Sequence, residues 1–165
     1  MLFRSVAHDW GGPVSLGWAL RNRDLVRGIV LTNTAVHQPA NAAAPALIRL
    51  SRWAPLRRTV TEQTPAFVRG TTLLSPNMPR EVAEAFAAPY RGRDSRAAVG
   101  DFVADIPLEP DHPSADTLAV IAESVSQFCD VPVLLAWGTD DPVFSERYLR
   151  DLMARVPTAD VHRYE

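Results

Sequence analysis

The start of the chain carries the clearest indication of its fold. A short apolar run at residues 2–7 leads into the turn His8-Asp9-Trp10-Gly11, and a helix is expected over about residues 13–21. A second apolar run rich in strand-forming residues follows at 28–32. Two short apolar strands separated by one helix predict a βαβ unit with parallel strands and a right-handed crossover. We therefore expect an α/β protein.

The middle of the chain differs in character from what precedes it. Residues 37–114 hold most of the 14 prolines, which favour short helices broken by turns. We expect such helices at about 43–51 and 79–87. The sequence therefore predicts three parts: an α/β core over 1–36, an inserted helical lid over 37–114, and a second α/β core part over 115–165.

The last part repeats the alternation of helix and strand. Ser114 is a suitable N-cap for a helix running to about Phe128, and residues 131–137 form an apolar run typical of a buried parallel strand. A turn over 138–144, a helix over 145–155 and a strand over 159–164 are expected to follow. The predicted architecture is thus a parallel sheet flanked by helices, with the lid inserted between its two halves.

Composition excludes several classes of function. A formal net charge of −2 gives no basic surface for nucleic acid. The single cysteine, Cys129, rules out an internal disulfide framework, and no cluster has metal-ligand spacing, so no metal or cofactor is expected. No apolar run is long enough to span a bilayer and the first residues do not resemble a signal peptide, so we expect a cytoplasmic protein.

The motif that carries chemistry is Ala7-His8-Asp9-Trp10-Gly11-Gly12, between the first strand and the first helix. A nucleophile elbow needs small residues two positions before and two positions after the nucleophile, and Ala7 and Gly11 meet this demand. Asp9 would then lie at a helix N-terminus, whose amides favour an ionised carboxylate. Such a carboxylate can attack carbon and form a covalent ester.

Each residue of this motif also has a simpler interpretation. Asp9 could serve only as the helix cap, although a cap requires neither a small residue at position 7 nor the Gly11-Gly12 pair. Trp10 could contribute only hydrophobic packing; its functional interpretation is an indole N–H that donates to a leaving group or a developing anion.

A second motif, Trp137-Gly138-Thr139-Asp140-Asp141-Pro142-Val143-Phe144, follows an expected buried strand. A catalytic histidine needs an acid that fixes its tautomer, and such groups meet at the C-terminal edge of a parallel sheet. Of the two aspartates we select Asp141. The simpler alternative is that both form a turn with Pro142.

These motifs together resemble the haloalkane dehalogenase and epoxide hydrolase branch of the α/β-hydrolase superfamily. The segments Ala85-Phe-Ala-Ala-Pro-Tyr90, Asp101-Phe-Val-Ala-Asp-Ile-Pro-Leu108 and His112-Pro-Ser114 are most similar to dehalogenase-type proteins, including the β-lactone decarboxylases of bacterial long-chain olefin synthesis. The resemblance covers nearly the whole chain. It implies a partial α/β-hydrolase fold, and it leaves haloalkane, epoxide and β-lactone open as substrates.

The resemblance also implies roles for individual residues. Asp9 becomes the nucleophile, Trp10 a neighbouring anion donor and Asp141 the acid partner of a base histidine. Some relatives place the acid where this chain has Asn33, and an amide there supports Asp141. Epoxide hydrolases use lid tyrosines, of which this lid offers only Tyr90, so the epoxide hydrolase interpretation is the weaker one.

The base histidine of the family lies in a loop after the last strand. His162 is expected on the strand itself, and His8, His37 and His112 are not at the required position, so the chain is expected to be a C-terminal fragment whose base histidine and oxyanion-type donors lie outside it. The alternative to an enzyme is a non-catalytic, truncated chain. Within such a fragment the strand at 2–7 would be an exposed edge, which predicts self-association.

The apolar residues of the expected lid suggest a small hydrophobic substrate, although the same side chains could form only the core of the lid. They are Leu47, Leu50, Trp53, Phe67, Leu73, Leu74 and Phe86.

Overall fold

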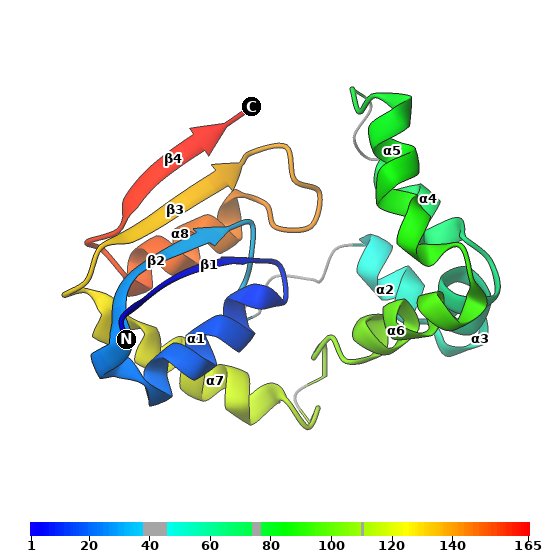
Figure 1. Cartoon of the computed structure of the whole chain (residues 1–165). Coiled ribbons are helices and arrows are strands. Elements are labelled where there is room, and N and C mark those ends of the chain that lie inside the picture. Colours follow the sequence, from blue (N-terminus) through cyan, green and yellow to red (C-terminus); the bar gives the residue numbers. More distant parts are fainter. Residues whose placement is uncertain (38–45, 74–76, 110) are drawn as a thin grey trace. The chain divides into compact units, whose positions relative to one another are not determined.

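The computed structural model describes residues 1–37, 46–73, 77–109 and 111–165. Its chain forms two compact units (Figure 1). The first, which we call the sheet unit, comprises Met1–Ala43 and Pro107–Glu165, and the second, the helical unit, comprises Ala44–Ile106.

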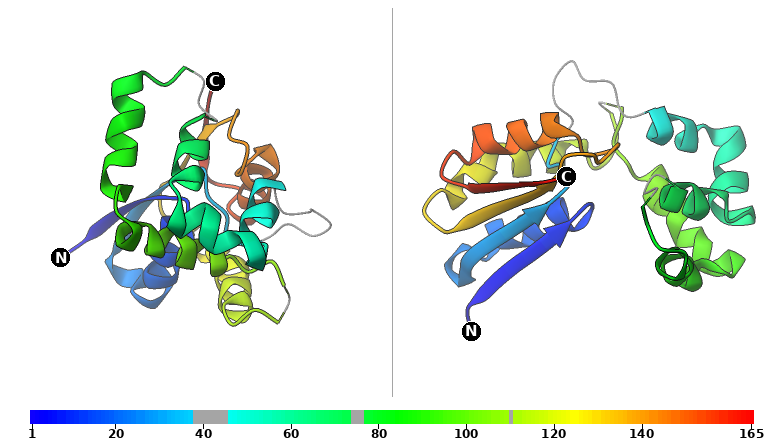
Figure 2. Two further views of the ribbon diagram at one scale, coloured as in Figure 1. Left: turned by 90° about the vertical axis from the view of Figure 1, so that its right-hand side faces the viewer. Right: turned by 90° about the horizontal axis from the view of Figure 1, so that it is seen from above.

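The sheet unit is built on four parallel strands. They are β1 (Phe3–His8), β2 (Val26–Thr32), β3 (Val133–Gly138) and β4 (Asp160–Tyr164). The spatial order is β1-β2-β3-β4, with every neighbouring pair parallel (Figure 2). The parallel sheet with flanking helices expected from the sequence is therefore confirmed, and the strand ends differ from the expected ones by at most two residues.

The strand register brings the C-terminal strand ends to one edge of the sheet. His8 at the end of β1 pairs with Thr32 at the end of β2, which in turn pairs with Ala136 near the end of β3. The turn that begins at Asp9 and the loop that follows Gly138 therefore leave the sheet at the same edge, which is where parallel α/β sheets carry their sites.

Three helices connect these strands: α1 (Gly11–Arg21), α7 (Ala115–Ser124) and α8 (Glu146–Arg155). Helix α1 begins two residues earlier than expected, because the first-turn amides of a helix need no internal partner and Pro13 fits within that turn. Short 3₁₀ turns follow α1 and α7, at Arg23–Leu25 and Val125–Phe128.

Ser114 is the N-cap residue of α7, as expected from the sequence, but its side chain makes no cap hydrogen bond and its backbone angles are helical. Its own backbone N–H donates to Nδ1 of His112, 3.2 Å away, so the chain before α7 is held by the histidine ring instead.

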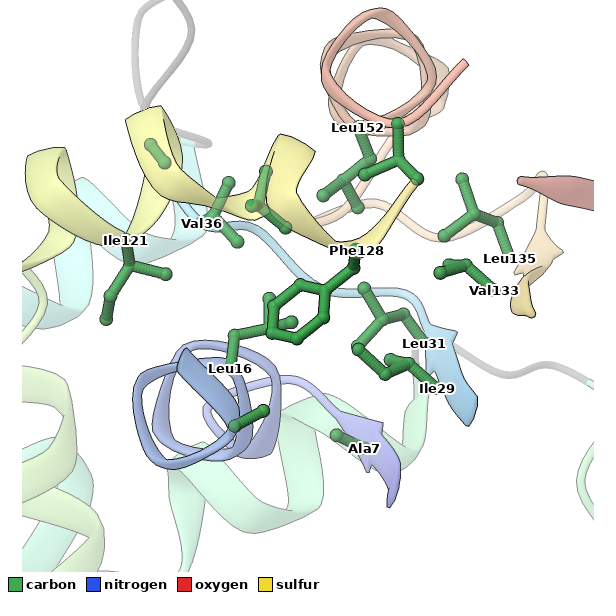
Figure 3. Close-up of a cluster of buried hydrophobic side chains, with 14 of the residues drawn as sticks. Ala7, Leu16, Ile29, Leu31, Val36, Ile121, Phe128, Val133, Leu135 and Leu152 are labelled. Carbon is green, nitrogen blue, oxygen red and sulfur yellow. The ribbon is translucent and has the colours of Figure 1, made fainter. Parts of the chain in front are cut away.

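The core of the sheet unit lies between these helices and one face of the sheet. Figure 3 shows Leu16 of α1, Ile121 of α7 and Leu152 of α8 directed toward the same cluster as the strand residues. Phe128, fully buried at its centre, contributes about 1.5–3 kcal/mol by leaving water. The residues that alternate with the strand residues of this cluster point to the opposite face of the sheet. The strand residues in the cluster include Ala7, Ile29, Leu31, Val133 and Leu135.

The helical unit consists of short helices. They are α2 (Ala46–Arg52), α3 (Ala54–Arg58), the π-helix η2 (Thr59–Gln63), α4 (Ala66–Leu73), α5 (Arg80–Ala87), the 3₁₀ turn η3 (Ala88–Tyr90) and α6 (Arg93–Ala104). Two of these, α2 and α5, lie where the sequence predicts helices.

The buried side chain of Arg96 connects helix α6 to its neighbours through hydrogen bonds. Arg96 is 7% exposed, and its guanidinium donates to the carbonyl oxygens of Glu62 (2.9 Å), Tyr90 (2.9 Å) and Arg91 (2.8 Å). One turn later Gly100 meets η2 so closely that a Cβ there would lie 2.8 Å from Oγ1 of Thr61. Arg96 therefore joins α6, η2 and η3 into one body.

Within the described ranges, no helix is both long and apolar enough to cross a bilayer.

Candidate active site

Asp9 occupies a strained turn directly after β1. Its backbone φ is 51°, in the left-handed region that non-glycine residues enter at a cost of about 1–2 kcal/mol. Three hydrogen bonds hold this conformation: the Asp9 N–H donates to the carbonyl of Asn33 (3.1 Å), and the Asp9 carbonyl accepts from Gly12 N–H (3.0 Å) and from the Thr34 hydroxyl (2.6 Å). The end of β2 thus stabilises the turn that presents the Asp9 side chain.

Asp9 is not the cap residue of α1. The N-cap position belongs to Trp10, and no side chain makes a cap hydrogen bond there. The interpretation of Asp9 as a simple helix cap therefore lacks the geometry it needs. Trp10 is half-buried at this position.

The close approach that shapes the turn occurs at Gly12 rather than at Gly11. A Cβ on Gly12 would overlap Thr34, at 2.8 Å from its Cβ and 2.9 Å from its Cγ2, whereas a Cβ on Gly11 would meet only Ala7, at 3.8 Å. The expectation that Gly11 is the sterically required small residue is therefore not met among the described residues. The requirement falls one position later, because α1 passes over Thr34 at that point.

The Asp9 carboxyl has a raised pKa. Although the residue is exposed by its accessible surface, the protein atoms around the carboxyl remove water, and this desolvation raises its pKa above the usual 3.8. The charge of His8 and the backbone N–H of Trp10 lower the pKa, and the charge of Asp141 raises it. The amide at the helix start does favour the anion as expected, but desolvation exceeds its effect.

Asp141 lies in the loop after β3 with a fixed orientation. Its Oδ1 accepts hydrogen bonds from the backbone N–H groups of Val143 (2.7 Å) and Phe144 (2.9 Å). The buried Trp137 secures the same loop, since its indole N–H donates to the Phe144 carbonyl at 2.8 Å. Asp141 is half-buried and Asp140 is exposed. Asp141 therefore has a turn-forming role. It also acts on Asp9, because its charge raises the pKa of the Asp9 carboxyl.

Asn33, between these two loops, ties their strands together. Its Nδ2 donates to the Gly138 carbonyl (2.9 Å), and its Oδ1 accepts from the Gly138 N–H (2.8 Å). Its backbone φ of 29° turns the chain sharply at the end of β2. A carboxylate could not supply the donor of this pair, which explains an amide at position 33 in structural terms.

The structure thus brings Asp9 and Asp141 to one edge of the sheet, with Asn33 and Thr34 supporting them. No pattern in the sequence marks Thr34 as part of the site, because a threonine after a strand carries no distinguishing signal. The structural role of Asn33 cannot be read from the sequence either, since its paired bonds to Gly138 depend on the strand register.

The histidines lie where the sequence places them. His162 is on β4, as expected, and its Nε2 is 3.1 Å from Oδ2 of Asp160. His8 is the last residue of β1 and is exposed. Among the described residues no group of three or more His, Cys, Asp or Glu side chains could hold a metal ion.

The helical unit contains a cavity of about 340 Å³. Its lining is mostly apolar with a few hydroxyl groups: Phe67, Val68, Thr71, Thr72, Met78, Phe86, Tyr90 and Val99. Of the apolar residues singled out in the sequence, Phe67 and Phe86 line this cavity, and Phe86 is also largely exposed, as are Trp53 and Leu73. Leu74 and the side chains of Leu47 and Leu50 lie outside the described residues.

Comparison with known proteins extends these observations. A family model described as the alpha/beta hydrolase fold matches residues 3–165. A cis-3-alkyl-4-alkyloxetan-2-one decarboxylase of Xanthomonas campestris is 33% identical over 161 residues, covering 96% of this chain and 54% of that protein. Haloalkane dehalogenase 2 of Mycobacterium bovis is 30% identical over 143 residues, covering 86% of this chain and 49% of that protein.

Among solved structures, the tetrameric haloalkane dehalogenase DpaA of Paraglaciecola agarilytica superposes with a TM-score of 0.77 at 21% identity, covering 97% of this chain and 52% of that one. The chain therefore spans about half the length of the relatives it matches.

Proposed function

This chain belongs to the alpha/beta hydrolase fold family, in the group of the haloalkane dehalogenases and oxetanone decarboxylases, and from that premise we propose that it carries the nucleophile of an enzyme that acts on a hydrophobic substrate. The nucleophile is Asp9, Asp141 is the acid that orients a histidine base, and Trp10 donates to the developing anion. The observation that carries the proposal is the strained backbone of Asp9 at the end of β1.

The strain supports a catalytic role because a helix cap or a surface aspartate needs no such conformation. The left-handed turn is maintained by Asn33 and by the buried Thr34, which both bond to the Asp9 backbone and not to its side chain. The supporting bonds therefore leave the carboxyl oxygens available to a substrate. Backbone strain held in this way by surrounding structure is typical of functional sites.

The proposed first step is the same for two substrate classes. One oxygen of the Asp9 carboxylate forms a bond to an electrophilic carbon, and the bond from that carbon to its leaving group breaks, with the electron pair going to the leaving group. With a haloalkane the products are an alkyl ester of Asp9 and a halide ion. Water activated by the base histidine then hydrolyses the ester.

With a β-lactone the leaving group is the ring oxygen, so that opening the ring gives an Asp9 ester with a carboxylate on the adjacent carbon. Loss of CO₂ from that carboxylate forms a carbon–carbon double bond and expels Asp9 as a carboxylate. This route regenerates Asp9 without hydrolysis. The 33% identity to an oxetanone decarboxylase over 96% of the chain favours this variant as the first one to test.

The assignment of Asp141 follows from its orientation. Because both backbone amides bond to Oδ1, the other oxygen is the one suited to accept from a histidine ring N–H. We infer that this histidine is not one of the four in this chain, since His162 lies on β4 and is paired with Asp160. The base is therefore supplied by residues outside this sequence, and the chain is a fragment of the enzyme.

The cavity of the helical unit supports a hydrophobic substrate. Aromatic and aliphatic side chains form most of its wall, which suits an alkyl chain, and the helical unit is proposed to act as the lid of the enzyme. Tyr90 at this wall is the residue that an epoxide hydrolase would use to polarise the epoxide oxygen, so epoxide opening is kept as an alternative in the assay below.

The experiment joins this chain to the part of the Xanthomonas campestris decarboxylase that it does not match. Decarboxylation of a dialkyl β-lactone, halide release from a haloalkane and opening of an epoxide are assayed in parallel. Asp9→Asn is expected to lower turnover by about 10⁴-fold, and the matched change Asp140→Asn at an exposed neighbour is expected to leave it unchanged. Full turnover in Asp9→Asn would remove the nucleophile assignment, and no turnover with any substrate would favour a non-catalytic chain.

A further inference from the structure

Charge is distributed unevenly between the two units of this chain. The helical unit holds nine arginines and six acidic residues, whereas the sheet unit holds eight arginines and 13 acidic residues. The formal charge of −2 of the whole chain is therefore the sum of a positive helical unit and a negative sheet unit. Such an uneven distribution attracts one part of a protein to an anionic surface.

The positive charge is densest in α2 and α3. Residues 25–61 contain no acidic residue, and ten successive positions hold four arginines: Arg49, Arg52, Arg57 and Arg58. Arg58 pairs with Glu62 at 3.5 Å, in an exposed bridge of the kind that contributes little. Arg49 is exposed and Arg57 is half-buried, and neither has an ion pair with a described residue. These two guanidinium groups are therefore available to an anion from outside the chain.

Apolar side chains are exposed among these arginines. Trp53, between α2 and α3, is 57% exposed, and Leu56 is 37% exposed. The N–H groups of Leu56 and Arg57 both donate to the Trp53 carbonyl, each at 2.9 Å. Residues three and four positions apart in a helical turn are neighbours on its surface. This turn therefore presents an indole, a leucine and a guanidinium side by side.

The inner side of the same segment is already packed. Ser51 of α2 is buried, and Thr61 of η2 is fully buried with its hydroxyl donating to the Arg57 carbonyl at 2.8 Å. The helices are thus fixed in the helical unit by residues other than Trp53 and Leu56. An exposed indole held in this way needs another explanation than packing within the unit.

We propose that α2 and α3 bind the surface of an anionic lipid bilayer. Trp53 and Leu56 enter the headgroup region, and the arginines contact lipid phosphates. Tryptophan is enriched at the membrane–water interface, and amphipathic segments with arginine beside tryptophan and leucine lie in the plane of that interface. The contact is peripheral, because α2 has seven residues and α3 has five.

An acidic protein is the competing partner. It would satisfy Arg49 and Arg57 equally well, but an interface made by charge alone leaves the exposed indole of Trp53 unexplained. A cluster of about four to eight basic residues on an amphipathic segment is the pattern that binds anionic headgroups. The observations therefore favour lipid, and the acidic protein becomes an outcome of the test.

The test measures co-sedimentation of the full chain with phospholipid vesicles. Vesicles of phosphatidylcholine mixed with phosphatidylglycerol should bind the chain about tenfold more tightly than phosphatidylcholine alone, and high salt should remove this preference. Each arginine near an anionic surface contributes a factor of about five, so the double change Arg49→Gln and Arg57→Gln should weaken binding about 25-fold. Trp53→Ser should weaken it about fivefold.

Two matched changes in the sheet unit serve as controls. Trp18→Ser, at a tryptophan of α1 that is 41% exposed, and Arg150→Gln, at an exposed arginine of α8, should leave vesicle binding unchanged. The variants of α2 and α3 should fold normally, since Trp53 bonds to its turn through its backbone carbonyl. Unchanged circular dichroism and unchanged hydrogen exchange in residues 59–63 verify this.

The outcomes decide between lipid and protein. Absence of vesicle binding overturns the proposal, and so does binding that Trp53→Ser and the double arginine variant leave unchanged, because another part of the chain then holds the lipid. Retention on immobilised polyglutamate that depends on Arg49 and Arg57, without vesicle binding, assigns the arginines to an acidic protein and also overturns it. The proposal does not depend on the proposed function: Asp9→Asn should bind vesicles as tightly as the wild type, whatever its turnover.

Discussion

Replacing Gly12 with alanine tests whether Thr34 supports the turn at Asp9. The new Cβ would overlap the Thr34 side chain, which is fully buried and whose hydroxyl donates to the Asp9 carbonyl at 2.6 Å. Overpacking of a buried site costs about 1–3 kcal/mol, and loss of the hydrogen bond adds about 1 kcal/mol. The higher helix propensity of alanine returns up to about 1 kcal/mol. We therefore expect Gly12→Ala to destabilise the protein by about 1–4 kcal/mol.

Gly11→Ala is the matched control. Its Cβ would make an ordinary contact with Ala7 at 3.8 Å, so this variant should be as stable as the wild type or slightly more stable. Urea unfolding followed by tryptophan fluorescence measures both variants under one set of conditions. If the free energies of unfolding of Gly11→Ala and Gly12→Ala agree within about 0.5 kcal/mol, the contact between Gly12 and Thr34 does not hold the turn and the reasoning is wrong.

Three further changes probe other parts of the structure. Because the folded state raises the pKa of Asp9, the wild type should lose stability relative to Asp9→Asn as pH rises from below 3.8 toward neutrality. Urea unfolding of both proteins across this pH range measures the difference in their free energies of unfolding. A difference that does not change with pH would contradict the prediction. Asn33→Leu removes both bonds to Gly138 and should cost about 2–4 kcal/mol by the same measurement. Asn33→Asp keeps the acceptor but sets a carboxylate oxygen against the Gly138 carbonyl, so it should be destabilising at neutral pH and less so at a pH low enough to protonate the new carboxyl. Arg96→Met removes three hydrogen bonds to carbonyl groups. Amide hydrogen exchange in residues 59–63 and 88–91 should become at least tenfold faster, whereas the amides of β2, which serve as the internal reference, should not change.

The sheet unit could be predicted closely because its sequence and its packing agree. Alternation of short apolar strands with amphipathic helices determines the order and direction of the strands, and the apolar run at 131–137 has no other suitable place than a buried strand. The strand position of His162 followed from the same alternation and is confirmed. The differences between expected and observed elements are small and lie at element ends. Helix α1, for example, begins at Gly11 and not at Pro13, because a proline fits more than one position of the first helical turn.

The details of the site depend on contacts that no local pattern encodes. The close approach at Gly12 arises because α1 crosses Thr34, a residue 22 positions further along the chain by number, and sequence spacing cannot reveal it. The raised pKa of Asp9 reflects atoms that surround the carboxyl after folding, whereas the local sequence shows only the amides at the start of the helix. In the helical unit, the π-helix at Thr59–Gln63 depends on Arg96 and Gly100, which lie on α6.

The most direct test of the nucleophile is to trap the ester on Asp9. The proposed function assigns the base histidine to residues outside this sequence, and it therefore predicts that the first step occurs without catalysed hydrolysis. Incubation of this chain with a 1-bromoalkane should then add one alkyl group per molecule. Peptide mapping by mass spectrometry is expected to locate that group on Asp9, and Asp9→Asn should stay unmodified. Folded protein that acquires no ester, or that acquires it equally on the exposed Asp140, would contradict the account.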